Sequence, residues 1–231
     1  MKKVCAVIVA GGVGTRIGGT TPKQYLKIKE KSILEITISN FVSSGLIHHF
    51  IVVAHPDFFT EVKSILDKFD ILSSVVESGK ERQNSVANGL TEAVKISDFV
   101  LVHDAARPFV NSSIIKNCID GLDENKAVVA AVKCKDTVKK TNSKLLVEST
   151  EDRSKFYLAQ TPQGFTKEMA EIVLSKINNS SEIGTDDVYF AEKLGIPVKI
   201  IEGSTFNFKI TTPEDLMLAE SLVEKYGYSI A

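Results

Sequence analysis

Short apolar runs alternate with amphipathic segments along nearly the whole chain, and this alternation predicts its architecture. The apolar runs are rich in β-branched residues and are expected to form strands at residues 4–10, 50–54, 74–77, 99–103, 127–132 and 198–202. Between them, apolar side chains recur with the period of a helix, and we expect helices at residues 32–43, 57–68, 81–95, 112–122, 167–177, 186–194 and 213–226. Such alternation favours an α/β fold with a doubly wound, mainly parallel sheet.

One segment interrupts the alternation. Residues 135–152 alternate polar and apolar positions around a turn-like cluster, Thr141-Asn142-Ser143-Lys144, which predicts a β-hairpin projecting from the sheet. The hairpin has too few apolar residues for a core of its own, so we expect it to need a partner surface, most simply a second copy of the chain. A mobile surface hairpin is the alternative. We expect one domain over residues 1–231, with residues 135–152 as its dimerisation arm.

Composition restricts the classes of function. The net charge of −1 gives no general attraction to nucleic acid or to a membrane surface, and no apolar run is long enough to span a bilayer. The three cysteines are isolated and lack C-x-x-C spacing, which indicates neither a disulfide framework nor a zinc site. We therefore expect a cytoplasmic protein that binds neither nucleic acid nor membranes.

The first predicted strand leads into the stretch with the strongest chemical signal, residues 7–26. Three of four consecutive positions are glycines that let the backbone approach a ligand closely: Gly11, Gly12 and Gly14. Two cations follow, Arg16 and Lys23. Exposed loop N–H groups together with cations favour a polyphosphate site at the carboxyl end of the strand.

Two familiar phosphate-binding loops do not fit this stretch. A P-loop needs Gly-Lys-Ser or Gly-Lys-Thr after four spacer residues, and the dinucleotide-binding pattern needs glycine where Ile17 stands. A Rossmann dehydrogenase would also need an acidic residue after the second strand, where Ala54 and His55 stand. The pattern G-G-x-G-T-R followed by P-K-x-Y-L instead resembles the sugar-phosphate and polyol-phosphate nucleotidyltransferases.

Asp104 directly follows the predicted strand 99–103, so it should lie at the same sheet edge as the glycine-rich loop. A carboxylate beside a polyphosphate favours a cation between them, which makes Asp104 a candidate Mg²⁺ ligand. The alternative is that Asp104 caps the next turn and pairs with Arg107. His103 is expected to be structural.

A second turn, Gly79-Lys80-Glu81, connects a predicted strand to a predicted helix. Its N–H groups and the Ser85 hydroxyl are suited to the edge of a pyrimidine base, and Arg82 to a phosphate or an acidic group. Arg153 follows the arm and Lys209 precedes the last helix. Each of these two cations, taken alone, is typical of a solvated surface charge.

Together, seven blocks resemble one enzyme family. They are A-G-G-x-G-T-R…P-K-Q-Y-L, G-x-x-R-x-x-S-V, V-H-D-A-A-R-P, D-T-V-K, D-R-S…A-Q-T-P-Q-x-F, T-D-D and N-F-K-I-T-T-P-E-D-L. In this order and over almost the whole chain they are similar to the 2-C-methyl-D-erythritol 4-phosphate cytidylyltransferases. The resemblance implies a Rossmann-like nucleotidyltransferase fold, a homodimer, and transfer of CMP from CTP to methylerythritol phosphate with Mg²⁺ or another divalent cation.

The resemblance also implies roles for the matched residues. Catalytic roles fall to Arg16, Lys23, Arg153 and Lys209. CTP would contact Ala10, Gly11, Gly12, Gly14, Gly79, Lys80, Ser85, Asp104 and Ala105. The acceptor phosphate and polyol would contact Arg107, Thr137, Arg153, Thr161, Thr185 and Lys209, with Asp104 as the metal ligand.

Two alternatives stay open at this point. Ribitol-5-phosphate cytidylyltransferases share the fold and the chemistry, and they often have glycine at the position of Gly11, whereas many methylerythritol enzymes have an acidic residue at the position of Phe206. The pairs that follow the methylerythritol pattern are Ser85-Val86, Ala105-Ala106 and Leu158-Ala159. A non-catalytic nucleotide-binding protein on the same fold would be favoured if the cations of the blocks were missing, and they are present.

Overall fold

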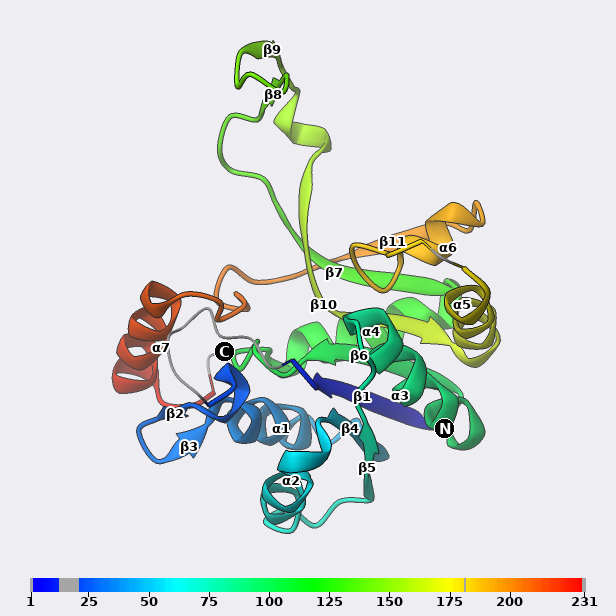
Figure 1. Ribbon diagram of the computed structural model, residues 1–231, viewed down its shortest axis with the longest axis vertical. Helices are drawn as coiled ribbons and strands as arrows, with labels where there is room; N and C mark the ends of the chain where they lie inside the picture. Colours follow the sequence, from blue (N-terminus) through cyan, green and yellow to red (C-terminus); the bar gives the residue numbers. More distant parts are fainter. Residues whose placement is uncertain (1, 13–20, 181, 230–231) are drawn as a thin grey trace.

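The computed structural model describes residues 2–12, 21–180 and 182–229, and a seven-stranded sheet forms its centre (Figure 1). The strand order is β11-β7-β10-β6-β1-β4-β5. The strands are β1 (Val4–Ala10), β4 (His49–Ala54), β5 (Ser73–Glu77), β6 (Phe99–Asp104), β7 (Ala127–Lys133), β10 (Tyr157–Thr166) and β11 (Val198–Glu202). All neighbouring pairs are parallel except those of β10, which runs antiparallel to β6 and β7. The predicted mainly parallel, doubly wound sheet is therefore confirmed.

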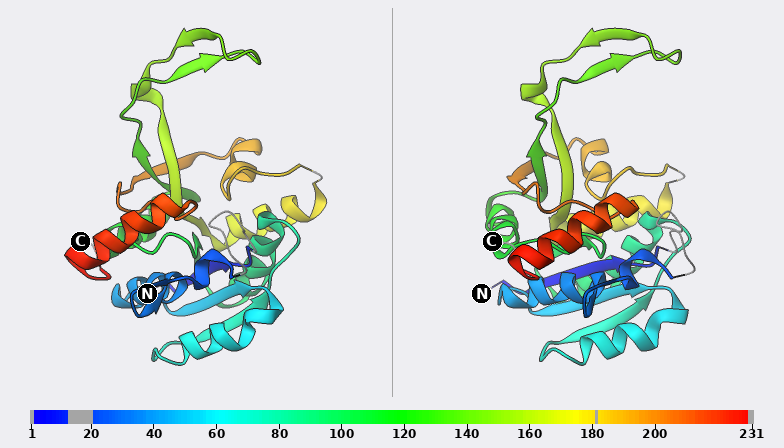
Figure 2. Two further views of the ribbon diagram at one scale, coloured as in Figure 1. Left: turned by 60° about the vertical axis from the view of Figure 1, so that its left-hand side comes forward. Right: turned by 90° about the vertical axis from the view of Figure 1, so that its left-hand side faces the viewer.

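Helices cover both faces of the sheet because successive side chains of each strand point to opposite faces. On β1, Ala6 and Ile8 pack on one face, and Cys5 and Val7 pack on the other. The first face is covered by α1 (Ile33–Ser43), α2 (Phe59–Leu66) and α4 (Ser112–Glu124), and the second by α3 (Arg82–Ile96), α5 (Lys167–Asn179) and α6 (Tyr189–Lys193) (Figures 1 and 2). Within the described residues, no helix combines the length and apolar character needed to cross a membrane.

The smaller elements lie around this three-layer body. They are the 3₁₀ turns η1 (Lys23–Tyr25) and η2 (Pro56–Phe58), the paired strands β2 (Lys27–Ile28) and β3 (Lys31–Ser32), and the last helix, α7 (Pro213–Tyr226). Helix α7 packs through Ala219 and Val223 on a separate apolar cluster that includes Ile36 of α1. Thr212 caps α7, with Pro213 in its first turn.

The structure corrects the expected elements in three places. The expected helix 57–68 is divided into η2 and α2. The expected helix 186–194 begins only at Tyr189, because a carboxylate oxygen of Asp186 accepts the Tyr189 N–H at 3.0 Å and the residues before it form a turn. Strand β10 was not expected, although it lies in the middle of the sheet.

The predicted hairpin is confirmed, and it stands on a stalk that was not predicted from the sequence. Strands β8 (Lys139–Thr141) and β9 (Val147–Thr150) pair antiparallel at the far end of the arm (Figure 1). The end of β7 and the start of β10 form the stalk, and the turn η3 (Arg153–Lys155) joins the hairpin to it (Figures 1 and 2). Apolar side chains on the hairpin are exposed, with Leu145 83% and Val147 60% accessible.

A buried hydrogen-bond chain fixes β10 against β6. His103 Nε2 lies 3.0 Å from the carbonyl oxygen of Arg107, which only accepts, so Nε2 carries the proton and Nδ1 accepts from the Thr161 hydroxyl at 3.0 Å. The same hydroxyl oxygen accepts the N–H of Asp104 at 3.1 Å. Burial lowers the pKa of His103 to about 4, so the ring is neutral at pH 7. His103 therefore has a structural role, as expected.

This chain predicts a pH dependence of stability. Between the ordinary pKa of 6.5 and about 4, the unfolded chain binds a proton at His103 that the folded protein does not. The stability that His103 contributes is therefore complete above pH 6.5 and is lost as the pH falls through this window. We expect the difference in free energy of unfolding between the protein and His103→Gln to shrink by about 2 kcal/mol from about pH 7 to about pH 5, measured by urea denaturation. A difference that stays constant over this range would contradict the assignment.

Candidate active site

The carboxyl ends of β1 and β6 and the turn between β5 and α3 meet at one edge of the sheet. Val9 of β1 pairs with Asp104 of β6, and the Ala105 N–H donates to the Val9 carbonyl at 3.1 Å. These segments enclose a cavity of about 240 Å³, named the nucleotide-side cavity after the sequence-based expectation that CTP binds there. Its lining includes Gly11, Gly12, Lys23, Gly79, Lys80, Ser85, Asp104, Ala105 and Lys209, all predicted site residues. Gly14 and Arg16 lie outside the described residues.

Two glycines of this cavity are required by close packing. A Cβ on Gly11 would lie 2.2 Å from the Cβ of Ser78, and one on Gly79 would lie 2.3 Å from the Cβ of Asn84. Either contact would force the backbone apart. The Gly79 N–H also donates to the Ser85 hydroxyl at 3.0 Å, so the β5–α3 turn is held against the start of α3.

Lys23 is placed at the cavity by its two neighbours in η1. The buried amide of Gln24 donates to the carbonyl oxygens of Ala10 at 2.6 Å and Gly12 at 2.8 Å, which ties η1 to the glycine-rich loop. The ring of Tyr25 stacks on Phe58 with centroids 4.3 Å apart. Gln24 was not assigned a role from the sequence, although it stands inside the P-K-Q-Y-L block.

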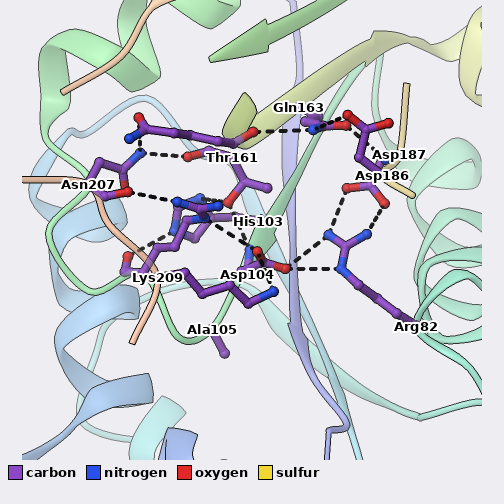
Figure 3. A network of polar contacts seen from close by, with 12 residues as sticks. Arg82, His103, Asp104, Ala105, Thr161, Gln163, Asp186, Asp187, Asn207 and Lys209 are labelled. Carbon is purple, nitrogen blue, oxygen red and sulfur yellow. Dashed lines mark hydrogen bonds and ion pairs between the residues drawn. The ribbon is translucent and has the colours of Figure 1, made fainter. Parts of the chain in front are cut away.

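Asp104 pairs with three cations: Arg107 from the turn directly after β6, and Arg82 and Lys209 from distant parts of the chain (Figure 3). One carboxylate oxygen accepts from Arg82 Nε at 3.1 Å, and the other lies 3.0 Å from Lys209 Nζ and 3.4 Å from Arg107 Nε. Burial alone would raise the pKa of Asp104, but Arg82, Lys209 and Arg107 lower it far below its ordinary value. Asp104 is therefore ionised across the physiological range. The pairing of Asp104 with Arg107, which was the alternative to a metal-ligand role, is present, and Arg82 faces acidic groups.

A second cavity of about 280 Å³ adjoins the first, and it is named the acceptor-side cavity after the sequence-based expectation that the acceptor phosphate and polyol bind there. Arg82, Asp104 and Lys209 line both cavities and so form their common wall. The rest of the second lining comprises Arg107, Ala159, Gln160, Thr161, Gln163, Thr185 and Asp186. Four of the predicted acceptor residues are thus brought together, namely Arg107, Thr161, Thr185 and Lys209.

Backbone and amide bonds hold Lys209 at this wall. The Ile210 N–H donates to the carbonyl of Ala106 at 2.8 Å, and Arg107 donates to the carbonyl of Asn207 at 2.9 Å. The buried Asn207 amide donates to the carbonyl of Thr161 at 2.8 Å (Figure 3). The segment before α7 is therefore fixed both to the loop after β6 and to β10. Asn207 stands in the last sequence block but was not assigned a role.

Two predicted acceptor residues lie elsewhere. Thr137 lies in the arm and Arg153 lies in the turn η3 at its base; both are exposed, and neither lines either cavity. The Arg153 guanidinium donates to the carbonyl oxygen of Lys135 at 2.6 Å. The single chain therefore does not bring these side chains to the cavities.

The side chains around Asp104 determine how a metal ion could bind there. Among the described residues, no group of three or more His, Cys, Asp or Glu side chains is arranged to hold a metal ion. Asp104 supplies one carboxylate at the common wall, and both its oxygens accept from cationic side chains. Mg²⁺ often binds through one or two carboxylates together with substrate phosphates, so Asp104 fits a metal that arrives with a polyphosphate.

Comparisons with known proteins identify the family of the chain. The family model described as IspD, 2-C-methyl-D-erythritol 4-phosphate cytidylyltransferase, matches residues 4–225. Proteins of that name from Syntrophus aciditrophicus (strain SB) and Clostridium botulinum (strain Langeland) are 38% and 40% identical. These matches cover 96% and 97% of this chain, and 97% and 99% of the relatives.

Solved structures give the same result. The crystal structure of 4-diphosphocytidyl-2C-methyl-D-erythritol synthase from Anaerococcus prevotii DSM 20548 matches with a TM-score of 0.88 and 33% identity, over 96% of each chain. The 2-C-methyl-D-erythritol 4-phosphate cytidylyltransferase of Thermus thermophilus matches with a TM-score of 0.78 and 29% identity, over 96% of this chain and 99% of that one. The chain therefore belongs to the 2-C-methyl-D-erythritol 4-phosphate cytidylyltransferase family.

Proposed function

We propose that the protein transfers CMP from CTP to 2-C-methyl-D-erythritol 4-phosphate and releases pyrophosphate. The observation that carries this proposal is the pair of adjoining cavities with one common wall of Arg82, Asp104 and Lys209. The glycine-lined cavity suits the nucleotide, and the neighbouring cavity suits a phosphorylated polyol. Family membership supplies the identity of the two substrates.

The reaction needs positioning and charge stabilisation more than proton transfer. An oxygen of the acceptor phosphate, already anionic, attacks the α-phosphorus of CTP, and the bond from that phosphorus to the pyrophosphate oxygen breaks. An anionic nucleophile needs no general base, which agrees with the neutral, fully buried and hydrogen-bonded His103. Lys23 at the nucleotide-side cavity and Lys209 at the common wall stabilise the charge that develops, and Arg16 is proposed to assist them.

Mg²⁺ or another divalent cation is the proposed cofactor. When bound, it neutralises phosphate charge and polarises the reacting phosphoryl group. Asp104 is the side chain that would hold it, together with phosphate oxygens of CTP. Lys209 and Arg107, which contact the same carboxylate oxygen of Asp104 in this structure, are then available to phosphate groups.

The two positions that depart from the pattern of many methylerythritol enzymes have local explanations. Gly11 is required by Ser78, whose Cβ leaves no room for another side chain. Phe206 is 39% exposed, lies near the ring of Tyr226 with centroids 6.4 Å apart, and lines neither cavity. Neither residue therefore bears on the choice of acceptor.

The arm is proposed to pair two copies of the chain. We treat residues 1–231 as one cytidylyltransferase domain whose arm, residues 135–152, contacts the second copy. Leu145, Leu146 and Val147 expose apolar surface on the hairpin that such a contact would bury. Arg153 and Thr137 lie away from their own cavities, so they are proposed to complete the acceptor site of the partner.

A cytoplasmic location is proposed on the basis of the cysteines. All three thiols are free, and burial raises the pKa of Cys5 and of Cys118 to about 12. Cys5 and Cys118 are therefore inert core groups, and three unpaired thiols fit a reducing compartment.

The substrate assignment predicts a clear preference. With Mg²⁺ and CTP, methylerythritol phosphate should release pyrophosphate at least ~100-fold faster than ribitol 5-phosphate, because a site shaped for one polyol leaves polar groups unpaired with another. Pyrophosphate release measured for each acceptor decides the point. A preference for ribitol 5-phosphate would refute the named acceptor, and CTP binding without turnover of either acceptor would favour a non-catalytic protein.

The proposed dimer predicts that two variants, Lys23→Ala and Arg153→Ala, complement each other when their subunits are mixed. Lys23→Ala should lower kcat at least ~100-fold, the scale of losing one charge stabiliser, and Arg153→Ala should weaken methylerythritol phosphate binding more than CTP binding. A mixed dimer has one site with both substitutions and one with neither. Random exchange of equal amounts should therefore restore about one quarter of the original activity. A monomer in solution, or verified mixed dimers without recovery, would show that Arg153 does not act in the partner's site.

A further inference from the structure

Arg82 occupies an unusual position for a cation. It is the first residue of α3, directly after the Gly79-Lys80-Glu81 turn, and its side chain is 34% exposed. A helix N-terminus carries partial positive charge, so a cation there is unfavourable unless its side chain finds acidic partners. Arg82 lines both the nucleotide-side and the acceptor-side cavity, so its partners decide how the two sides are connected.

The Arg82 guanidinium joins two carboxylates that come from different segments. Its two terminal nitrogens donate to the two oxygens of Asp187 at 2.6 and 2.9 Å, while Nε donates to Asp104 at 3.1 Å (Figure 3). Asp187 is 4% exposed and Asp104 is 6% exposed. A planar fork with five donors is able to hold both carboxylates at once, which a lysine ammonium does not reproduce.

Asp187 lies in the segment that brings Thr185 to the acceptor-side cavity. The next residue along α3, Gln83, bonds the same segment twice, since its amide donates to the carbonyl of Glu182 at 3.1 Å and accepts the Gly184 N–H at 2.9 Å. From the sheet side, Gln163 accepts the Asp187 N–H at 2.9 Å. The segment is irregular up to α6, so these side-chain bonds fix its path.

From this geometry we infer that Arg82 is a positioning residue of the acceptor site. Its fork on Asp187 holds segment 182–188 at the start of α3 and so sets the place of Thr185, while its third bond keeps Asp104 at the common wall. Arg82 thereby connects the turn that borders the nucleotide to the segment that borders the polyol. This role rests on the proposed function. Affinity for the acceptor then depends on the Arg82–Asp187 ion pair, whether or not these side chains contact the acceptor.

Steady-state kinetics of Asp187→Asn and Arg82→Lys test this role. Asp187→Asn removes the charge but leaves the Arg82–Asp104 bond, and Arg82→Lys keeps a cation without the fork. Each should raise KM for methylerythritol phosphate at least ~10-fold and change KM for CTP less than ~3-fold. The double variant should be no worse than the poorer single variant, because the two side chains act as one unit. Lys95→Ala, which removes the exposed pair with Glu92 at the other end of α3, is the matched control and should match the unsubstituted protein.

The outcomes separate this inference from the proposed function. An acceptor KM within twofold of the original in both variants, or an equal rise in both KM values, would overturn the positioning role. Thermal unfolding of each variant shows whether it is folded, and if Asp187→Asn does not fold, Arg82→Lys decides by the same criteria. Absence of turnover in the unsubstituted protein would refute the proposed function. Calorimetric binding of methylerythritol phosphate in the presence of CTP would then test Arg82, with a loss of at least ~10-fold in affinity expected and unchanged affinity contradicting it.

Discussion

The buried carboxylate of Asp104 is the group on which the rest of the site depends. A buried charge is tolerated only when it is paired and hydrogen-bonded, and Asp104 meets this condition through Arg82, Arg107 and Lys209. These cations come from α3, from the loop after β6 and from the segment before α7. One carboxylate therefore brings three parts of the chain to the edge of the sheet where the glycine-rich loop begins.

The cations around Asp104 are placed for catalysis by the folded protein itself. The cations stand beside the cavities before any substrate arrives, which is the preorganisation that makes charge stabilisation effective in phosphoryl transfer. The polar chain from Arg107 through His103 and Thr161 to the Asp104 N–H fixes the backbone beneath them. The Asp104 carboxylate is thus held by the three cations, and the backbone of β6, which carries Asp104, is held by a separate set of hydrogen bonds.

The sequence predicts the parallel strands and their helices well, because these elements have clear local signals. The apolar runs of β1 and β11 are typical of strands, and the Thr212 cap with Pro213 marks the start of α7. The sequence does not predict β10, because Pro162 and Gly164 are unfavourable inside a strand. The strand accommodates them where its register shifts between Ala159 and Gln163, which local sequence does not reveal. Local motifs predict a site at the glycine loop, Lys23 and Asp104, and Gly11, Gly12, Lys23 and Asp104 line one cavity. The bond from Arg82 to Asp187 was not predicted, because it joins positions 105 residues apart. The proposed role of Arg153 came from family resemblance, since nothing near it in the sequence indicates a partner site.

The two adjoining cavities are proposed to be the two halves of one reaction site. A crystal structure of the protein with the product CDP-methylerythritol tests this proposal most directly. We expect the cytidine against Gly11, Gly79 and Ser85, the diphosphate beside Lys23 and Lys209, and the methylerythritol group in the second cavity beside Thr185. A product bound away from the Asp104 wall, or one whose polyol group lies outside the second cavity, would contradict the proposal.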